Sequence, residues 1–172
     1  MAANHKLMRK KDNIYSFKEF CKLTAPSSWL GEDGLPSDEY RWIFRKEYLG
    51  LDRFIEAQDR LNTYQTALEE VKAGKKKTHW IWFIFPQMSG LGKSKMSKYY
   101  GIDGRDEAIE YIHTPILRDR LVEITEAVYN NEKSVYEIFG NDAIKVRSCM
   151  LLFASVSDIP IFKKMISKYS WK

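Results

Sequence analysis

One stretch of the chain, residues 74–100, holds an unusual density of side chains that could do chemistry. It begins with lysines at 75–77 and continues through a histidine and an aromatic cluster between 79 and 85. A glycine-containing loop, residues 90–94, then leads into a segment with helical spacing. Backbone N–H groups at a helix start bind anions, and glycines let an anion approach closely. The sequence therefore predicts an anion site near Gly90, Gly92 and Ser94.

The same loop looks like the end of a phosphate-binding P-loop, but the match fails at one position. That motif needs a glycine five residues before its second glycine, and Gln87 stands there. The histidines (5, 79 and 113) and cysteines (21 and 149) lack the spacing of metal ligands. No Gly-x-Ser-x-Gly nucleophile elbow occurs. We therefore expect no metal site, and no cofactor follows from the sequence.

Two polar side chains in apolar surroundings are open to two interpretations. Histidine is the side-chain type suited to proton transfer near neutral pH, so His79 could act as a general acid or base, which makes it the candidate catalytic residue. It could equally begin a helix and bond a backbone carbonyl. Gln58 falls on an apolar helical stripe, where a buried amide must find partners. It is either a core glutamine bonded to backbone or a residue that, with Gln87, orients a ligand.

Aromatic and basic residues supply the remaining candidates. Trp80 and Trp82 could stack on a base or similar ring, although aromatics in an apolar run usually belong to the core. Lys145, Arg147 and Ser148 share one predicted helix. If that helix faces the 79–94 segment, they would form an anion-binding wall; otherwise they are ordinary surface residues.

The elements that must position these residues are predicted to be helices. Apolar residues recur at helical spacing, and Gly, Pro, Ser and Asp mark the ends. The expected helices span about 14–24, 38–48, 51–73, 93–100, 104–113, 115–130, 133–139, 142–156 and 158–169. Residues 79–85 favour a strand by propensity, but no second strand is evident to pair with them. We expect a short, buried helix or extended plug there, within an all-α, single compact multi-helix domain.

Charge and cysteine content indicate the setting. The 172-residue chain has a formal net charge of +5, which favours anionic partners such as nucleotides, phosphorylated metabolites or nucleic acid. Two cysteines in apolar segments predict buried free thiols and a reducing compartment. No apolar run is long enough to span a membrane, and the basic start lacks the apolar core of a signal peptide. We expect a cytoplasmic protein that does not contact membranes.

The chain from about residue 51 to 169 resembles the uncharacterised bacterial family called domain of unknown function 1810, also labelled calpastatin-like. The phrase that carries the likeness is His79-Trp80-x-Trp82-Phe83-Ile84-Phe85-Pro86-Gln87, followed by Gly90-Leu91-Gly92-x-Ser94. Further matches are Phe54-x-x-Ala57-Gln58 and Lys145-x-x-Ser148-x-Met150-x-Leu152-Phe153. The resemblance implies an all-α fold, and thus a helix at 79–85, but no established activity.

The domain organisation and the function follow as expectations. Residues 51–172 should form the helical family domain, and residues 1–50 an N-terminal extension, a basic arm plus two helices, packed on it. We expect a pocket around the 79–94 segment that binds a small anionic nucleotide-like ligand, with turnover of that ligand left open. The alternative is a non-catalytic interaction module for protein or nucleic acid, in which that segment is purely structural. The oligomeric state does not follow from the sequence.

Overall fold

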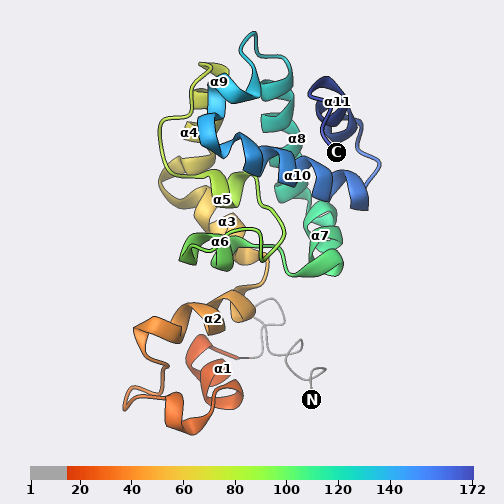
Figure 1. Cartoon of the computed structure of the whole chain (residues 1–172). Helices are drawn as coiled ribbons and strands as arrows, with labels where there is room; N and C mark the ends of the chain where they lie inside the picture. Colours follow the sequence, from red (N-terminus) through yellow and green to blue (C-terminus); the bar gives the residue numbers. More distant parts are fainter. Residues whose placement is uncertain (1–14) are drawn as a thin grey trace. The chain divides into compact units, whose positions relative to one another are not determined.

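The computed structural model describes residues 15–172, and helices joined by loops make up that range (Figure 1). No strand occurs in the described part of the chain; two isolated β-bridges, Leu30 with Pro36 and Met88 with Ile102, are the extended contacts found there. The all-α prediction is therefore confirmed. The chain divides into two compact units, one that ends at Arg53 and one that spans Phe54–Lys172. The basic arm at 1–13 lies outside the described residues, and packing of the extension on the rest stays a prediction.

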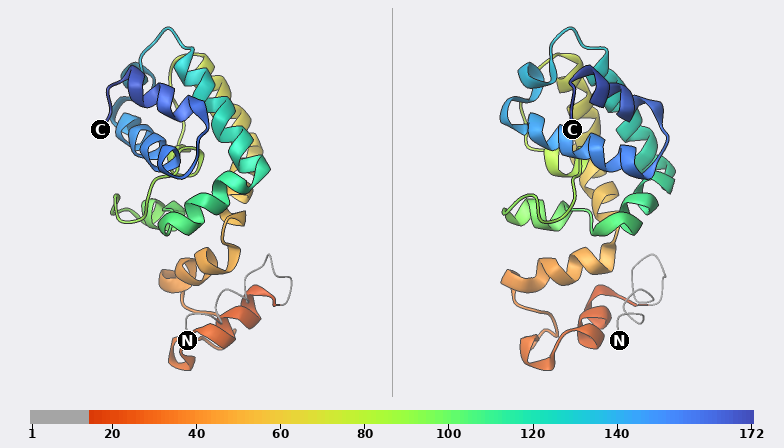
Figure 2. Two further views of the ribbon diagram at one scale, coloured as in Figure 1. Left: turned by 90° about the vertical axis from the view of Figure 1, so that its right-hand side faces the viewer. Right: turned by 45° about the vertical axis from the view of Figure 1, so that its right-hand side comes forward.

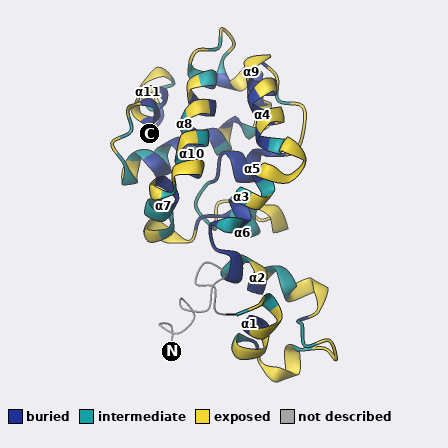
Figure 3. Cartoon of the chain, turned by 180° about the vertical axis from the view of Figure 1, so that it is seen from behind, coloured by how far each residue is buried: buried dark blue, intermediate teal, exposed yellow. Residues whose placement is uncertain are grey.

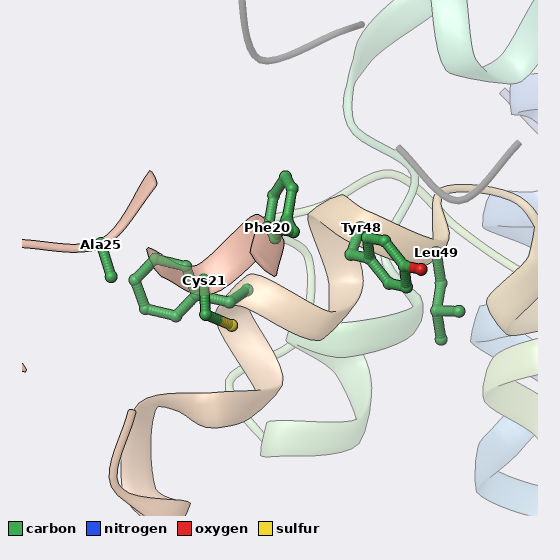
Figure 4. Close-up of a cluster of buried hydrophobic side chains, with 6 residues drawn as sticks. Phe20, Cys21, Ala25, Tyr48 and Leu49 are labelled. Atoms are coloured by element: carbon green, nitrogen blue, oxygen red, sulfur yellow. The ribbon is translucent and has the colours of Figure 1, made fainter. Parts of the chain in front are cut away.

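The first unit contains two helices joined by a turn-rich loop. Helix α1 (Phe17–Thr24) begins with a capping box, in which Ser16 and Glu19 each satisfy a backbone N–H of the other. The loop holds the short 3₁₀ helix η3 (Ser27–Trp29) and leads into α2 (Asp38–Leu49). Figure 4 shows the core between these helices, where Phe20 and Cys21 lie close to residues of α2.

The expected continuous helix over 51–73 is wrong, because the chain breaks it in the middle. Helix α3 (Asp52–Asp59) ends in the 3₁₀ turn η4 (Arg60–Asn62), and α4 (Thr63–Lys72) begins afresh. Leu61 and Asn62 both have positive φ, the left-handed conformation that costs about 1 kcal/mol in L-residues. Leu61, which helical spacing would place one turn beyond Gln58, is 92% exposed. Beyond the break, α4 buries Tyr64, Leu68 and Val71.

Helices of the second unit pack around α10 (Ala143–Val156), which contacts α7 (Gly104–His113), α9 (Val135–Phe139) and α11 (Pro160–Lys168). Helices α4 and α8 (Pro115–Tyr129) lie side by side (Figure 2). Tyr64 of α4 fixes this pairing by donating its hydroxyl proton toward the Glu123 carboxylate and the Arg120 carbonyl of α8. Figure 3 shows the inward faces of these helices buried and their outward faces exposed.

The disputed segment is a short helix, α5 (Ile81–Ile84), which confirms the expected buried aromatic segment. Trp80 and Phe85 at its two ends are fully buried. The α4–α5 connection is fastened by the Glu70 carboxylate, which accepts hydrogen bonds from the backbone of Lys77 and Thr78 and from the Trp80 indole. The four-residue helix α5 is therefore stabilised by side-chain hydrogen bonds and burial rather than by helix propensity.

Candidate functional site

A groove in the second unit collects side chains from α5, from the loop after it, from α6 (Lys95–Tyr100) and from α10. Its volume is about 510 Å³, within the range of pockets that hold small organic ligands. The residues that line it are Trp82, Gln87, Leu91, Gly92, Lys93, Ser94, Ser97, Ile144, Lys145 and Ser148. We refer to these residues as the groove.

Helix α10 supplies one wall because its two faces differ. Val146, Cys149 and Met150 are buried against the core, whereas Ile144, Lys145 and Ser148 line the groove. The latter three fall at positions i, i+1 and i+4, which lie on one side of a helix. The first turns of α10 thus bring an ammonium, a hydroxyl and an aliphatic side chain to the groove.

The opposite wall is a loop held closely against the start of α6 and α7. The Ser89 amide donates to the Ile102 carbonyl and the Ile102 amide to the Gln87 carbonyl, each at 2.9 Å. The Ser89 hydroxyl donates to the Asp103 carboxylate at 2.7 Å. A Cβ on Gly92 would overlap the Ser97 side chain, so only glycine permits this approach of loop to helix. The groove wall is therefore preformed by backbone contacts.

Ser94 is engaged in capping α6. Its hydroxyl oxygen accepts from the Ser97 amide at 3.1 Å, and the hydroxyl donates to the Ser97 Oγ at 2.9 Å. The Ser97 hydroxyl keeps its own proton to donate, as does that of Ser148. These hydroxyls offer neutral hydrogen bonds to a ligand in the groove.

The two tryptophans of the 79–85 segment have different surroundings. Trp80 is fully buried and donates its indole N–H to the Glu70 carboxylate at 2.8 Å. Trp82 is half-buried and lines the groove. Of the two expected stacking residues, the structure places Trp82 where a ligand could reach it and Trp80 in the core.

Gln58 is buried and has the bonding of a core glutamine. Its amide nitrogen donates to the Phe83 carbonyl of α5 at 2.9 Å, and its amide oxygen accepts from the Arg120 guanidinium at 3.2 Å. Gln58 does not line the groove, but it ties α3 to the helix that carries Trp82. It therefore acts on the groove through the position of α5.

Three other predicted site residues are also away from the groove. His79 is exposed, and it is not among the side chains that line the groove. Gly90 is exposed with φ +93°, and a Cβ there would meet nothing within 4 Å. Arg147 donates to the carbonyl of Lys172 at 2.6 Å. The structure thus brings together Trp82, Gln87, Gly92, Ser94, Lys145 and Ser148 and leaves out Gln58, His79, Trp80, Gly90 and Arg147.

Leu91, Ser97 and Ile144 line the groove but were not among the predicted site residues. Leu91 and Ile144 are 63% and 61% exposed, so the groove is bordered by two unburied aliphatic side chains. Ser97 had a detectable signal, because it lies three residues after the helix-capping Ser94. The signal for Ile144 was its place beside Lys145 at the start of a predicted helix.

The electrostatics of the groove favour an anion. None of the described side chains that line it is acidic, and two of them are lysines. The ammonium of Lys145 donates to Asp142 Oδ1 at 2.8 Å, and the other carboxylate oxygen of Asp142 lies 3.1 Å from the Lys76 ammonium. Burial alone would raise the pKa of Asp142, but hydrogen bonds from Lys145 and Lys76 outweigh it and lower the pKa below its ordinary value. Asp142 is therefore ionised at neutral pH.

Other kinds of site were sought in residues 15–172. No group of three or more His, Cys, Asp and Glu side chains in that range could hold a metal ion. Cys21 and Cys149 are both buried and free. No helix of the described chain is both long and apolar enough to cross a membrane.

Comparison with known proteins gives a family but no activity. The conserved hypothetical protein Rv1873 from Mycobacterium tuberculosis, known from a crystal structure, is similar to this chain at 40% sequence identity and a TM-score of 0.67. The match covers 71% of this chain and 89% of that one. No curated protein matches. The model of the family described as protein of unknown function (DUF1810) matches residues 48–171, and the chain therefore belongs to that family.

Proposed function

We propose that the groove binds a small anionic, nucleotide-like ligand. One observation carries the proposal: the half-buried Trp82 lines the same groove as Lys93 and Lys145. None of the described residues that line this groove is acidic. A flat ring would stack on Trp82, and a phosphate would meet the ammonium groups and the hydroxyls of Ser97 and Ser148. Stacking of a base on an aromatic side chain contributes about 1–3 kcal/mol.

Binding rather than turnover is the form of the proposal that the geometry supports. The candidate acid–base residue, His79, does not line the groove. The polar groups that do line it are an amide, hydroxyls and ammonium groups, which hold an anion without supplying a neutral-pH base. A cytoplasmic location forms part of the proposal, supported by the two free, buried cysteines.

A thermal-shift screen of the full chain against nucleosides, nucleotides, dinucleotides and cyclic nucleotides tests the proposal. Saturable binding at about 100 times Kd should raise the unfolding midpoint by several degrees. Calorimetry should then show affinity reduced about tenfold or more in Trp82→Ala and in Lys145→Met. Trp29→Ala and Lys72→Met are matched controls, because these exposed side chains lie outside the groove. A flat response across the panel, or equal losses in the controls, would refute the proposal.

A second candidate function, binding of nucleic acid, has one observation of its own. Helix α11 and Tyr129 of α8 border a shallow hollow lined by Lys163, Lys164, Ser167 and Lys168. Clustered lysines bind phosphate backbones with strong salt dependence. Salt-dependent binding of an oligonucleotide, weakened by Lys163→Met with Lys164→Met but not by Lys145→Met, would support this candidate over the first.

A further inference from the structure

One lysine of the 75–77 run differs from its neighbours. The Lys76 side chain is 11% exposed, whereas Lys75 and Lys77 are exposed residues. The Lys76 ammonium donates to the Thr78 carbonyl at 2.7 Å and lies 5.2 Å from the centre of the Trp80 ring. A solvated surface lysine would make no such set of contacts, so this charge is held in a fixed place.

The fixed charge is linked to the groove through one carboxylate. Asp142 lies between two ammonium groups, with Lys76 3.1 Å from one oxygen and Lys145 2.8 Å from the other. The exposed fractions of the Asp142 and Lys145 side chains are 25% and 24%, so water screens the cluster only in part. The three groups carry a net charge of +1. Without Lys76, Asp142 would neutralise Lys145 and leave the pair with no net charge.

We propose that Lys76 and Asp142 are positioning residues that set the charge of the groove and make it select the phosphorylated form of its ligand over the uncharged nucleoside. Asp142 holds the Lys145 ammonium at the wall, and Lys76 offsets the charge of the carboxylate that does so. The proposal rests on the function proposed above and deepens it, since it assigns the discrimination between neutral and phosphorylated ligands to residues behind the groove.

A charge effect of Lys76 and a purely structural role predict different changes in affinity when Lys76 is replaced, because only the charge effect depends on the charge of the ligand. If Lys76 only stabilised the fold, its loss would weaken the binding of neutral and charged ligands alike. If it acts by charge, the loss grows with each negative charge on the ligand. An ammonium about 8 Å from a phosphate, in a medium with a dielectric constant of about 60, changes affinity about threefold per unit of ligand charge.

The test is calorimetry with adenosine, AMP and ADP on the full chain at low salt. In Lys76→Met the affinity for adenosine should equal that of the wild type, while the affinity for AMP falls about tenfold and that for ADP further. Lys76→Arg keeps the charge and should retain most of the affinity for both nucleotides. Lys75→Met removes the same charge from an exposed neighbour and should change each affinity by less than about twofold.

The outcomes separate the two proposals. If the wild type binds none of the three compounds and the thermal-shift panel is also flat, the proposed function and this inference both fall; if the panel returns another nucleotide, that nucleotide and its nucleoside take the place of AMP and adenosine. If it binds AMP or ADP but Lys76→Met weakens adenosine equally, or leaves all three unchanged, this inference is overturned and the proposed function stands. Thermal unfolding of each variant fixes a temperature at which all are folded, and Lys76→Gln is the second charge-removing variant should Lys76→Met fail to fold.

Discussion

Replacing Glu70, a residue that does not line the groove, should remove much of the stability of the Phe54–Lys172 unit. The Glu70 carboxylate is buried and accepts four hydrogen bonds. Its donors are the backbone amides of Lys77 and Thr78 (2.8 and 3.2 Å), the Thr78 hydroxyl (2.6 Å) and the Trp80 indole (2.8 Å). Together with the bond from the Lys75 amide to the Glu70 carbonyl (3.0 Å), these bonds fasten the 75–79 connection to α4, so the position of α5 depends on them.

The size of the loss in the free energy of unfolding depends on which of these donors can form hydrogen bonds with water instead. In Glu70→Ala the fully buried Trp80 indole N–H would lose its partner, at a cost of about 1–3 kcal/mol. The amides of Lys77 and Thr78 belong to exposed residues and can turn to water, so each loses about 1 kcal/mol. The sum, about 3–5 kcal/mol, is a large part of the 5–15 kcal/mol typical of a folded domain. In Glu70→Gln one amide oxygen remains to accept, and we expect about 2 kcal/mol.

Urea unfolding followed by circular dichroism measures this loss, with Glu69→Gln as the matched control. Glu69 is the exposed neighbour, and it accepts a single bond from Gln65 at 3.2 Å. Its replacement should change the free energy of unfolding by less than about 0.5 kcal/mol.

The pH dependence gives an independent check. Burial alone would raise the pKa of Glu70, but the bonds from Lys77, Thr78 and Trp80 outweigh it and lower the pKa below the unfolded value of about 4.5. A group with a lowered folded pKa contributes stability above its unfolded pKa and loses it as the pH falls through the folded pKa. The difference between wild type and Glu70→Gln should therefore be full at pH 7 and shrink below about pH 4.5. A difference that matches the Glu69→Gln control, or that does not change with pH, would refute the reasoning.

Two further predictions concern the backbone. Leu61→Gly should raise the free energy of unfolding by up to about 1 kcal/mol, because Leu61 has φ +50° and its side chain is 92% exposed, so that it buries little. Chemical denaturation measures this change. A clear loss of stability would show that the Leu61 side chain contributes to the fold. Gly92→Ala should cost about 1–3 kcal/mol and weaken ligand binding, since its Cβ would overlap Ser97. The double variant with Ser97→Gly should recover part of that loss, whereas Gly90→Ala, in open space at φ +93°, should cost only about 1 kcal/mol and gain nothing from Ser97→Gly.

Most helix positions could be predicted because their ends carry local signals. Pro115 and Pro160 stand in the first turns of α8 and α11, and Ser94 caps α6 with its side chain. The helix at α5 could not be decided from propensity, since its β-branched and aromatic residues suit a strand. It was decided by the family resemblance and by the lack of a pairing partner.

The break at Leu61 and Asn62 could not be predicted, because the apolar spacing continues across it. What opposes a straight helix is tertiary: Gln58 bonds to α5, and Tyr64 bonds to α8. These long-range bonds act on opposite sides of the break, and only Asn62, a residue type that tolerates the left-handed region, gave a local hint. Prediction of the candidate site from the sequence was limited in the same way. The 79–94 phrase located one wall of the groove, but the link from Lys76 to Asp142 depends on contacts between distant segments.

The two hypotheses drawn from the sequence, a ligand site and a structural keystone, turn out to describe neighbouring residues of one phrase. Trp80 is bonded to Glu70 in the core, while Trp82 two residues later lines the groove. A Trp80 variant that loses ligand binding would therefore not show that Trp80 contacts the ligand, because the substitution would also displace α5. Only a variant such as Trp82→Ala, with the melting temperature kept near that of the wild type, separates the two. If Trp82→Ala binds a ligand as tightly as the wild type, the phrase serves the fold alone.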